Sequence, residues 1–206
     1  MSSTVDLPRR SLRGRPADTV ARLLGATVVE LRSRPAKGLT VRSVARRAGV
    51  APATAYTYFS SRDHLVTEVF WQRLQSLPDP VTTGGTAAGR AGAALAEVAT
   101  LVAGEPELAA ACTQAMLADD PEVRRLRDSI GAVIMARLAG ALGDDADDAR
   151  LRALGLAFSG AMLQAGMGHL DYEDLPRQLS SAASLILDGH RIDGSTPPAN
   201  EHGGDE

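Results

Sequence analysis

Between residues 52 and 58 the sequence carries side chains that can lie close to a phosphate backbone and hydrogen-bond to it. They are small, hydroxylated or aromatic: Pro52, Ala53, Thr54, Tyr56, Thr57 and Tyr58. Hydroxyl groups on a surface without bulky side chains can reach phosphate oxygens, which accept many of the hydrogen bonds in protein–DNA complexes. Two alternatives stay open: Tyr56 can belong to the core, and Thr54 can be an ordinary surface residue of a helix.

Two short helices joined by a tight turn would present these side chains. Val44 and Ala45 face inward from the first helix, and Ala45 is small enough to let the second helix approach closely. Gly49 supplies the left-handed backbone conformation that a sharp turn needs. Pro52 stands at the first position of the second helix, and Phe59 packs the exit of that helix against the core. This pattern predicts a helix-turn-helix, whose second helix enters the major groove of DNA.

The same run resembles the tetracycline-repressor (TetR) family of bacterial transcriptional regulators. The matching residues are Thr40, Val44, Ala45, Ala48, Gly49, Val50, Thr54, Tyr56, Tyr58, Phe59, Ser61, Arg62, Asp63 and Leu65. The resemblance covers about residues 18–70. It implies an N-terminal three-helix DNA-binding domain, a connecting fourth helix, and a larger helical domain that binds a small molecule and dimerises.

The resemblance implies a role in DNA contact for individual residues. Base edges or thymine methyl groups would be met by Arg42, Pro52, Ala53 and Tyr56. Phosphates would be held by Thr40, Thr54, Thr57, Tyr58 and Arg62. Arg62, in the first turn of the fourth helix, would couple DNA contact to the tilt of that helix. Ala51 replaces the serine usual at this helix start, and the small Ala53 and Ala55 shift base readout toward Arg42 and DNA shape.

Helical periodicity predicts an all-α fold with about nine helices. Asp18 and Ser60 are the expected N-caps of the first and fourth helices. Beyond the breaks at residues 78–85, helices are expected at 87–103, 106–118, 122–142, 147–169 and 174–189. The expected organisation is a flexible Arg-rich arm (1–16), a helix-turn-helix DNA-binding domain (17–60), a connecting helix (61–77), a ligand-binding and dimerisation domain (86–189) and a disordered tail (190–206).

The charges divide between the two ends of the chain. Residues 1–75 hold 13 basic and 5 acidic side chains, whereas residues 76–206 hold 9 basic and 20 acidic ones. A basic head on an acidic body favours a nucleic-acid-binding head. The single cysteine excludes a disulfide framework, and the N-terminus has no signal-peptide pattern. The most apolar window, 153–168, is too short to span a bilayer, so we expect a cytoplasmic protein without a membrane partner.

The expected ligand pocket combines apolar and sulfur-containing side chains with one amide: Trp71, Cys112, Met116, Phe158, Met162, Gln164 and Met167. Plain core packing is the alternative for the methionines and aromatic residues. Gln164 lies in an apolar stretch and needs a polar partner, which is either a ligand or a second subunit. Such a lining favours a lipophilic effector.

The resemblance implies that the last two helices form a four-helix bundle with those of a second subunit. The expected contacts are Leu156, Leu163, Leu175, Leu179, Ala183 and Ile186. A homodimer would place two recognition helices on a palindromic operator.

Catalytic patterns are missing from the sequence. The four histidines are scattered, helix capping explains the acidic residues at 144–148, and no phosphate loop or nucleophile elbow occurs. We therefore expect no enzymatic activity, cofactor or metal. The sequence favours a homodimeric repressor of transcription that binds double-stranded DNA and a small-molecule effector. The alternatives are an effector-independent architectural DNA-binding protein and a helical interaction module.

Overall fold

The computed structural model describes residues 15–33 and 38–189. Within these ranges the chain forms nine α-helices and two short 3-10 segments, and no strand occurs there. The all-helical prediction is therefore confirmed for the described residues. The expected tail (190–206) lies outside them, and so does most of the expected arm. Arg15 and Pro16, which we assigned to that arm, instead form the start of the first helix.

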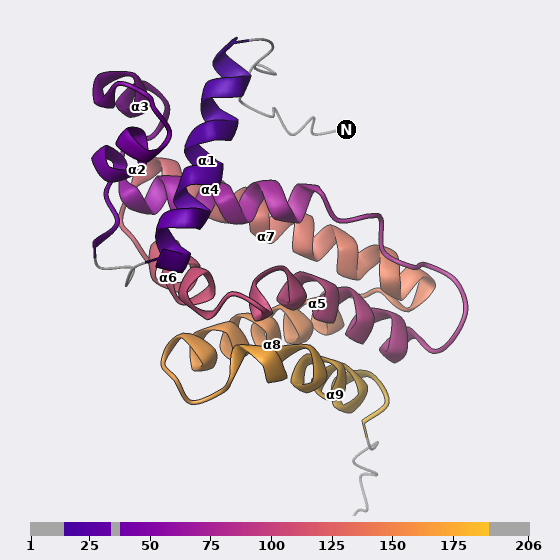
Figure 1. Cartoon of the computed structure of the whole chain (residues 1–206). Helices are drawn as coiled ribbons and strands as arrows, with labels where there is room; N and C mark the ends of the chain where they lie inside the picture. Colours follow the sequence, from indigo (N-terminus) through magenta and orange to yellow (C-terminus); the bar gives the residue numbers. More distant parts are fainter. Residues whose placement is uncertain (1–14, 34–37, 190–206) are drawn as a thin grey trace, which may run out of the picture.

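Four helices make up the N-terminal part of the fold, drawn in indigo to magenta in Figure 1. They are α1 (Arg15–Ser33), α2 (Val41–Arg47), α3 (Pro52–Tyr58) and α4 (Arg62–Gln75). Two expected caps are wrong. Asp18 lies inside the first turn of α1. Ser61 rather than Ser60 caps α4, because its hydroxyl accepts a 3.0 Å hydrogen bond from the backbone N–H of His64.

Five further helices follow and form the body of the molecule. They are α5 (Ala87–Ala103), α6 (Pro106–Met116), α7 (Pro121–Leu142), α8 (Asp148–Gly166) and α9 (Leu175–Leu187). Their ends lie within three residues of those expected from periodicity. Acidic caps account for two of the starts: Asp120 accepts from the N–H of Glu122, and Asp147 from that of Arg150.

The helix α9 packs chiefly against α5 of its own chain. A glycine makes this approach possible, since a Cβ added to Gly92 would lie 3.1 Å from the Cα of Ser180. Leu175, Leu179 and Ala183 of α9 are buried. These three residues, which we assigned to a subunit interface, are therefore already covered within the subunit.

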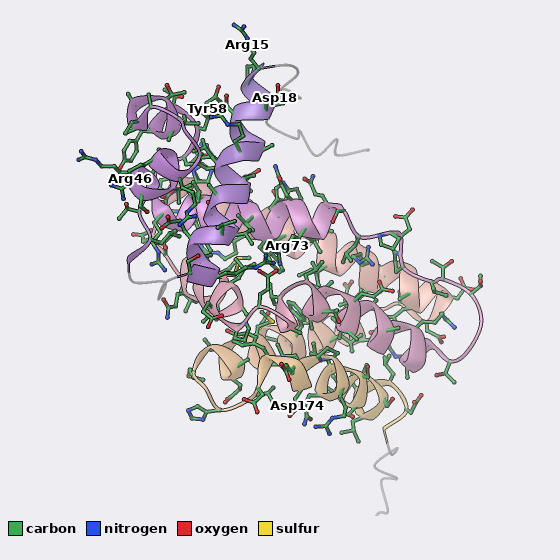
Figure 2. All side chains as sticks on the ribbon, in the orientation of Figure 1. Arg15, Asp18, Arg46, Tyr58, Arg73 and Asp174 are labelled. Atoms are coloured by element: carbon green, nitrogen blue, oxygen red, sulfur yellow. The ribbon has the colours of Figure 1, made fainter. Side chains whose placement is uncertain are left out.

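The N-terminal helices are tied to the body by a carboxylate between two guanidinium groups. Glu105, just before α6, accepts 2.8 Å from Nε of Arg32 on α1 and lies 2.7 Å from Nη2 of Arg73 on α4. Arg73 also donates a 2.8 Å hydrogen bond to the carbonyl of Leu101. Figure 2 shows Arg73 near the centre of the molecule, between the two parts of the fold. Three helices thus meet at one acidic side chain.

Candidate functional sites

The turn between α2 and α3 has the geometry that the sequence predicts. Gly49 has φ +63°, a conformation that suits glycine. The N–H of Val50 donates 2.9 Å to the carbonyl of Ala45, and Ala45 itself is fully buried. From α1, Arg22 donates to the carbonyls of Ala48 and Gly49. The two short helices are therefore held at a fixed angle, as a helix-turn-helix requires.

The outer face of α3 is open. Ala55 is the one buried residue of this helix, whereas Pro52, Ala53, Thr54 and Thr57 are exposed. Tyr56 is 53% exposed, so its alternative place in the core is excluded. Tyr58 is half-buried. These side chains therefore form the accessible surface of the second motif helix.

The hydroxyls on this surface differ in their availability. Thr57 donates 2.6 Å to the carbonyl of Thr54, so its side chain must rotate to reach a phosphate. Thr40 caps α2 by accepting from the N–H of Ser43, at 3.0 Å. That arrangement leaves the hydroxyl proton of Thr40 available to a phosphate oxygen. The structure therefore favours Thr40 as the better-prepared donor of the two.

Basic side chains flank this surface. Arg42 is exposed on α2, and Arg46 points away from the body in Figure 2. Arg47 instead lies 2.7 Å from the buried carboxylate of Glu30 and so has a structural partner. Arg62, at the start of α4, has a buried Nε without a hydrogen-bond partner among the described residues. Its Nη1 lies 3.5 Å from Oδ1 of Asp63, so the guanidinium has an acidic neighbour and one unpartnered nitrogen among the described residues.

The start of α4 is joined to the start of α7. The hydroxyls of Ser61 and Ser60 donate to Oδ2 of Asp120, at 2.6 Å and 3.2 Å, while Oδ1 accepts from the N–H of Glu122 at 2.8 Å. Burial alone would raise the pKa of Asp120, but these hydrogen bonds hold the pKa below its ordinary value. One ionised carboxylate thus links the N-termini of two helices.

An apolar cavity of about 410 Å³ lies between α4, α6, α7 and α8. Four of the expected pocket residues line it: Cys112, Met116, Phe158 and Met162. Its size falls within the range of ligand sites in proteins. Burial raises the pKa of the Cys112 thiol to about 12, so this sulfur stays protonated.

Three expected pocket residues do not line this cavity. Gln164 and Met167 are exposed, and Met167 is 52% accessible. We expected the amide of Gln164 to need a hydrogen-bond partner. Because Gln164 reaches solvent, it needs no such partner within the subunit. Trp71 is half-buried and packs against the core from α4. None of the three belongs to the cavity lining, which the sequence pattern could not reveal.

The α7 side of the cavity was missed in the sequence. Its residues are Arg127, Ile130, Gly131, Ile134 and Met135, and Phe70 of α4 adds to the wall. The i, i+4 spacing of Ile130 and Ile134 marks one face of α7, but it does not distinguish a cavity wall from solid packing.

The outer face of α8 exposes large apolar side chains. Leu156 is 68% exposed, and Leu163 and Met167 are also exposed. On α9, Leu185 is 75% exposed and Ile186 is half-buried. Two of the expected interface residues, Leu156 and Leu163, therefore lie on an accessible apolar face of the chain.

Two kinds of site are not found in the described part of the chain. No cluster of three or more histidine, cysteine or acidic side chains there is arranged to hold a metal ion. None of the described helices has the length and hydropathy needed to cross a membrane.

Known proteins share both this sequence and this fold. A sequence model for "Bacterial regulatory proteins, tetR family" matches residues 23–69. An uncharacterised HTH-type transcriptional regulator of Mycobacterium tuberculosis is 43% identical over 173 residues, which cover 83% of this chain and 81% of the relative. A counterpart of Mycobacterium bovis matches to the same extent.

Solved structures agree with these sequence matches. A TetR transcriptional regulator from Rhodococcus sp. RHA1 aligns with a TM-score of 0.68 at 20% identity, over 83% of this chain and 98% of that one. The regulator FadR from Bacillus subtilis, in complex with stearoyl-CoA, aligns with a TM-score of 0.61 at 19% identity, over 82% of this chain and 98% of that one. Fold, motif and the mycobacterial relatives together identify the chain as a member of the TetR family of DNA-binding transcriptional regulators.

Proposed function

We propose that this protein is a repressor that binds a palindromic operator as a homodimer and leaves it when a lipophilic small molecule occupies the cavity. The position of the cavity carries the proposal. Phe70 belongs to its wall and to α4, the helix whose first turn holds Arg62. A ligand against Phe70 would therefore act on the helix that orients a proposed phosphate contact.

A second connection runs through the segment between α6 and α7. Met116 and Leu117 line the cavity just before the segment that contains Asp120. Asp120 in turn accepts hydrogen bonds from Ser60 and Ser61 at the junction of α3 and α4. A ligand that displaced this wall would shift the carboxylate and with it the start of α4. DNA affinity would then fall by linkage, because ligand and DNA favour different positions of α4.

On the DNA, we assign direct base contacts to the α2 and α3 surface. The proposed base-reading residues are Arg42, Pro52, Ala53 and Tyr56. The proposed phosphate contacts are Thr40, Thr54, Thr57, Tyr58 and Arg62. The exposure of α3 and of Arg42 supports this assignment.

For the dimer, we propose an interface centred on α8. Leu156 and Leu163 would pack against the second subunit, with Ile186 and Leu185 of α9 at the edge. Their exposure supports this arrangement, because neighbouring large apolar side chains on a surface mark an interaction site. Gln164 would lie within the same interface and gain a polar partner there.

The structural neighbour FadR supports an effector with an alkyl chain, since its structure is a complex with stearoyl-CoA. The apolar lining of the cavity in this chain agrees with such a molecule. The proposed effector is accordingly an alkyl-containing compound.

Selection from random duplex DNA, followed by binding at several salt concentrations, tests the proposal. We expect a palindromic consensus whose affinity falls as salt rises. Added lipophilic ligand should weaken binding to that consensus. Salt-sensitive binding without a consensus would favour an architectural protein, and absence of binding would favour an interaction module. Either result would overturn the proposed function.

A further inference from the structure

Among the described residues, Arg127 is the only charged one in the wall of the cavity. Its Nη1 donates a 2.6 Å hydrogen bond to the carbonyl of Met116, at the end of α6. No carboxylate of the described residues forms an ion pair with it. The neighbouring arginines of α7 differ, because Arg124 pairs with Asp119 and Arg125 with Glu122. Within residues 15–33 and 38–189, the guanidinium at the cavity therefore has no ion-pair partner.

The remaining N–H groups of Arg127 are accessible. A guanidinium has five N–H donors, and the hydrogen bond to Met116 uses one of them. No nitrogen of Arg127 is both buried and without a hydrogen-bond partner. The planar group can therefore offer two parallel donors to a ligand while it keeps its contact with α6.

Along α7 the wall changes from charged to apolar. Ile130 and Ile134 follow Arg127 along the wall. Met135 then lies close to Gly155 of α8, because a Cβ added at Gly155 would be 3.2 Å from the Met135 sulfur. Eight residues of helix separate Arg127 from Met135, a distance of about 12 Å. An apolar chain of that length would lie along α7, with its polar end at Arg127.

We infer that the effector is an amphipathic anion with a medium-length alkyl chain, whose negatively charged head binds Arg127 and whose tail lies between α7 and α8. This inference rests on the proposed function. Arg127 offsets the cost of placing the anionic head beside an apolar wall. A neutral head would lack the charge-assisted hydrogen bonds, and a cationic head would be repelled.

Calorimetric titration of the full chain at neutral pH tests this inference with four ligands that share one tail. These are decanoate, decyl phosphate, 1-decanol and decylammonium, each below its micelle-forming concentration. We expect one or both anions to bind about tenfold more tightly than 1-decanol, and decylammonium to bind more weakly. The tighter anion identifies the headgroup as carboxylate or phosphate.

Variants at Arg127 test whether this residue causes the preference for an anionic headgroup. Arg127→Met should remove the preference for the anion and leave the affinity for 1-decanol unchanged, whereas Arg127→Lys should retain part of it. Arg125→Met is the matched control, because Arg125 is exposed on the same helix and does not line the cavity. Thermal unfolding verifies that each variant is folded. If Arg127→Met does not fold, the reduced preference for the anion is measured on Arg127→Lys instead.

Two results would overturn the inference and leave the proposed function intact. One is equal affinity of the protein for decanoate, decyl phosphate and 1-decanol. The other is an anion preference that survives in Arg127→Met. Failure of all four ligands to bind would overturn the inference as well, whereas the proposed function would then be decided by the DNA selection and a wider search for ligands.

Discussion

The hydroxyl of Ser61 donates a 2.6 Å hydrogen bond to Asp120, and each of these residues also caps a helix. Ser61 accepts from the N–H of His64 in α4, while Asp120 accepts from that of Glu122 in α7. The two caps are thus one hydrogen-bonded unit, although 59 positions separate them in the chain. A shift of either helix along its axis stretches this unit.

The first prediction concerns the coupling between these caps. Asp120→Ala should lower the free energy of unfolding by about 1–2 kcal/mol, because α7 loses its cap. Combined with Ser61→Ala, it should show a coupling energy of about 0.5–3 kcal/mol in a double-mutant cycle measured by urea unfolding. Asp147→Ala is the control, since Asp147 caps α8 without touching α4, and it should add to Ser61→Ala without coupling. Additivity of Ser61→Ala and Asp120→Ala would contradict the proposed connection.

The second prediction separates base reading from phosphate binding. Arg42→Ala should reduce discrimination at one base pair of the selected site by about 1–3 kcal/mol. Arg62→Ala should weaken all sequences alike and lower the dependence of affinity on salt by about one phosphate contact. Binding measured on a set of single-base variants across salt distinguishes the two effects. Arg47→Ala is a useful comparison, because this arginine already pairs with Glu30.

A third prediction follows from two glycines of the same helix. A Cβ at Gly166 would lie 2.5 Å from Cγ2 of Thr113, whereas a Cβ at Gly160 would meet nothing within 4 Å. Thr113 has little room to move, since its hydroxyl bonds to the carbonyl of Ala109 and to the hydroxyl of Tyr172. Gly166→Ala should therefore destabilise the chain by about 1–3 kcal/mol. Gly160→Ala should stabilise it by up to about 1 kcal/mol in the isolated subunit, through helix propensity, as chemical denaturation would show.

The fourth prediction is a pH dependence that arises from Glu105. Burial would raise the pKa of this carboxyl, but hydrogen bonds and charge from Arg32 and Arg73 lower the pKa below its ordinary value. A lowered pKa in the folded state stabilises the fold above the unfolded pKa of about 4.3, and this stabilisation disappears as pH falls through the folded value. Glu105→Gln should therefore cost about 1 kcal/mol at neutral pH and progressively less below about pH 4. Urea unfolding across this range measures the difference, and a difference that grew on acidification would contradict the assignment.

The fifth prediction tests the proposed interface. Leu156→Glu places a charge on the exposed face of α8 and should convert the dimer to monomers in analytical ultracentrifugation. Val81→Glu is the control, because Val81 is also exposed but lies on the connection between α4 and α5. It should leave the association state unchanged. A dimer that persisted in Leu156→Glu would place the interface elsewhere.

Local chemistry is what made the N-terminal part of the fold predictable from sequence. Gly49 and Pro52 restrict the backbone at fixed positions, and the buried pair Ala45 and Ala55 requires close helices. Such constraints act within a few residues and can be read without knowing the rest of the fold. The helix ends of the body were predictable for the same reason, through caps such as Asp147.

The direction of each helix face in the body was not predictable in this way. Leu179 and Leu185 look alike in sequence, yet the first is buried in the fold and the second is 75% exposed. Gln164 was expected to be enclosed because its neighbours are apolar, but the rotation of α8 turns it to solvent. Contacts such as that between Ser61 and Asp120 join segments that are far apart in the sequence, so no local pattern predicts them.

The single thiol of the chain lies in the cavity wall and is held in its unreactive, protonated form. Its sulfur is 3.9 Å from the carbonyl of Val66 on α4. Alkylating reagents act on a thiolate that they can reach, so modification of Cys112 requires the wall to open. The rate at which an alkylating reagent labels Cys112 therefore reports how often this part of the cavity wall opens.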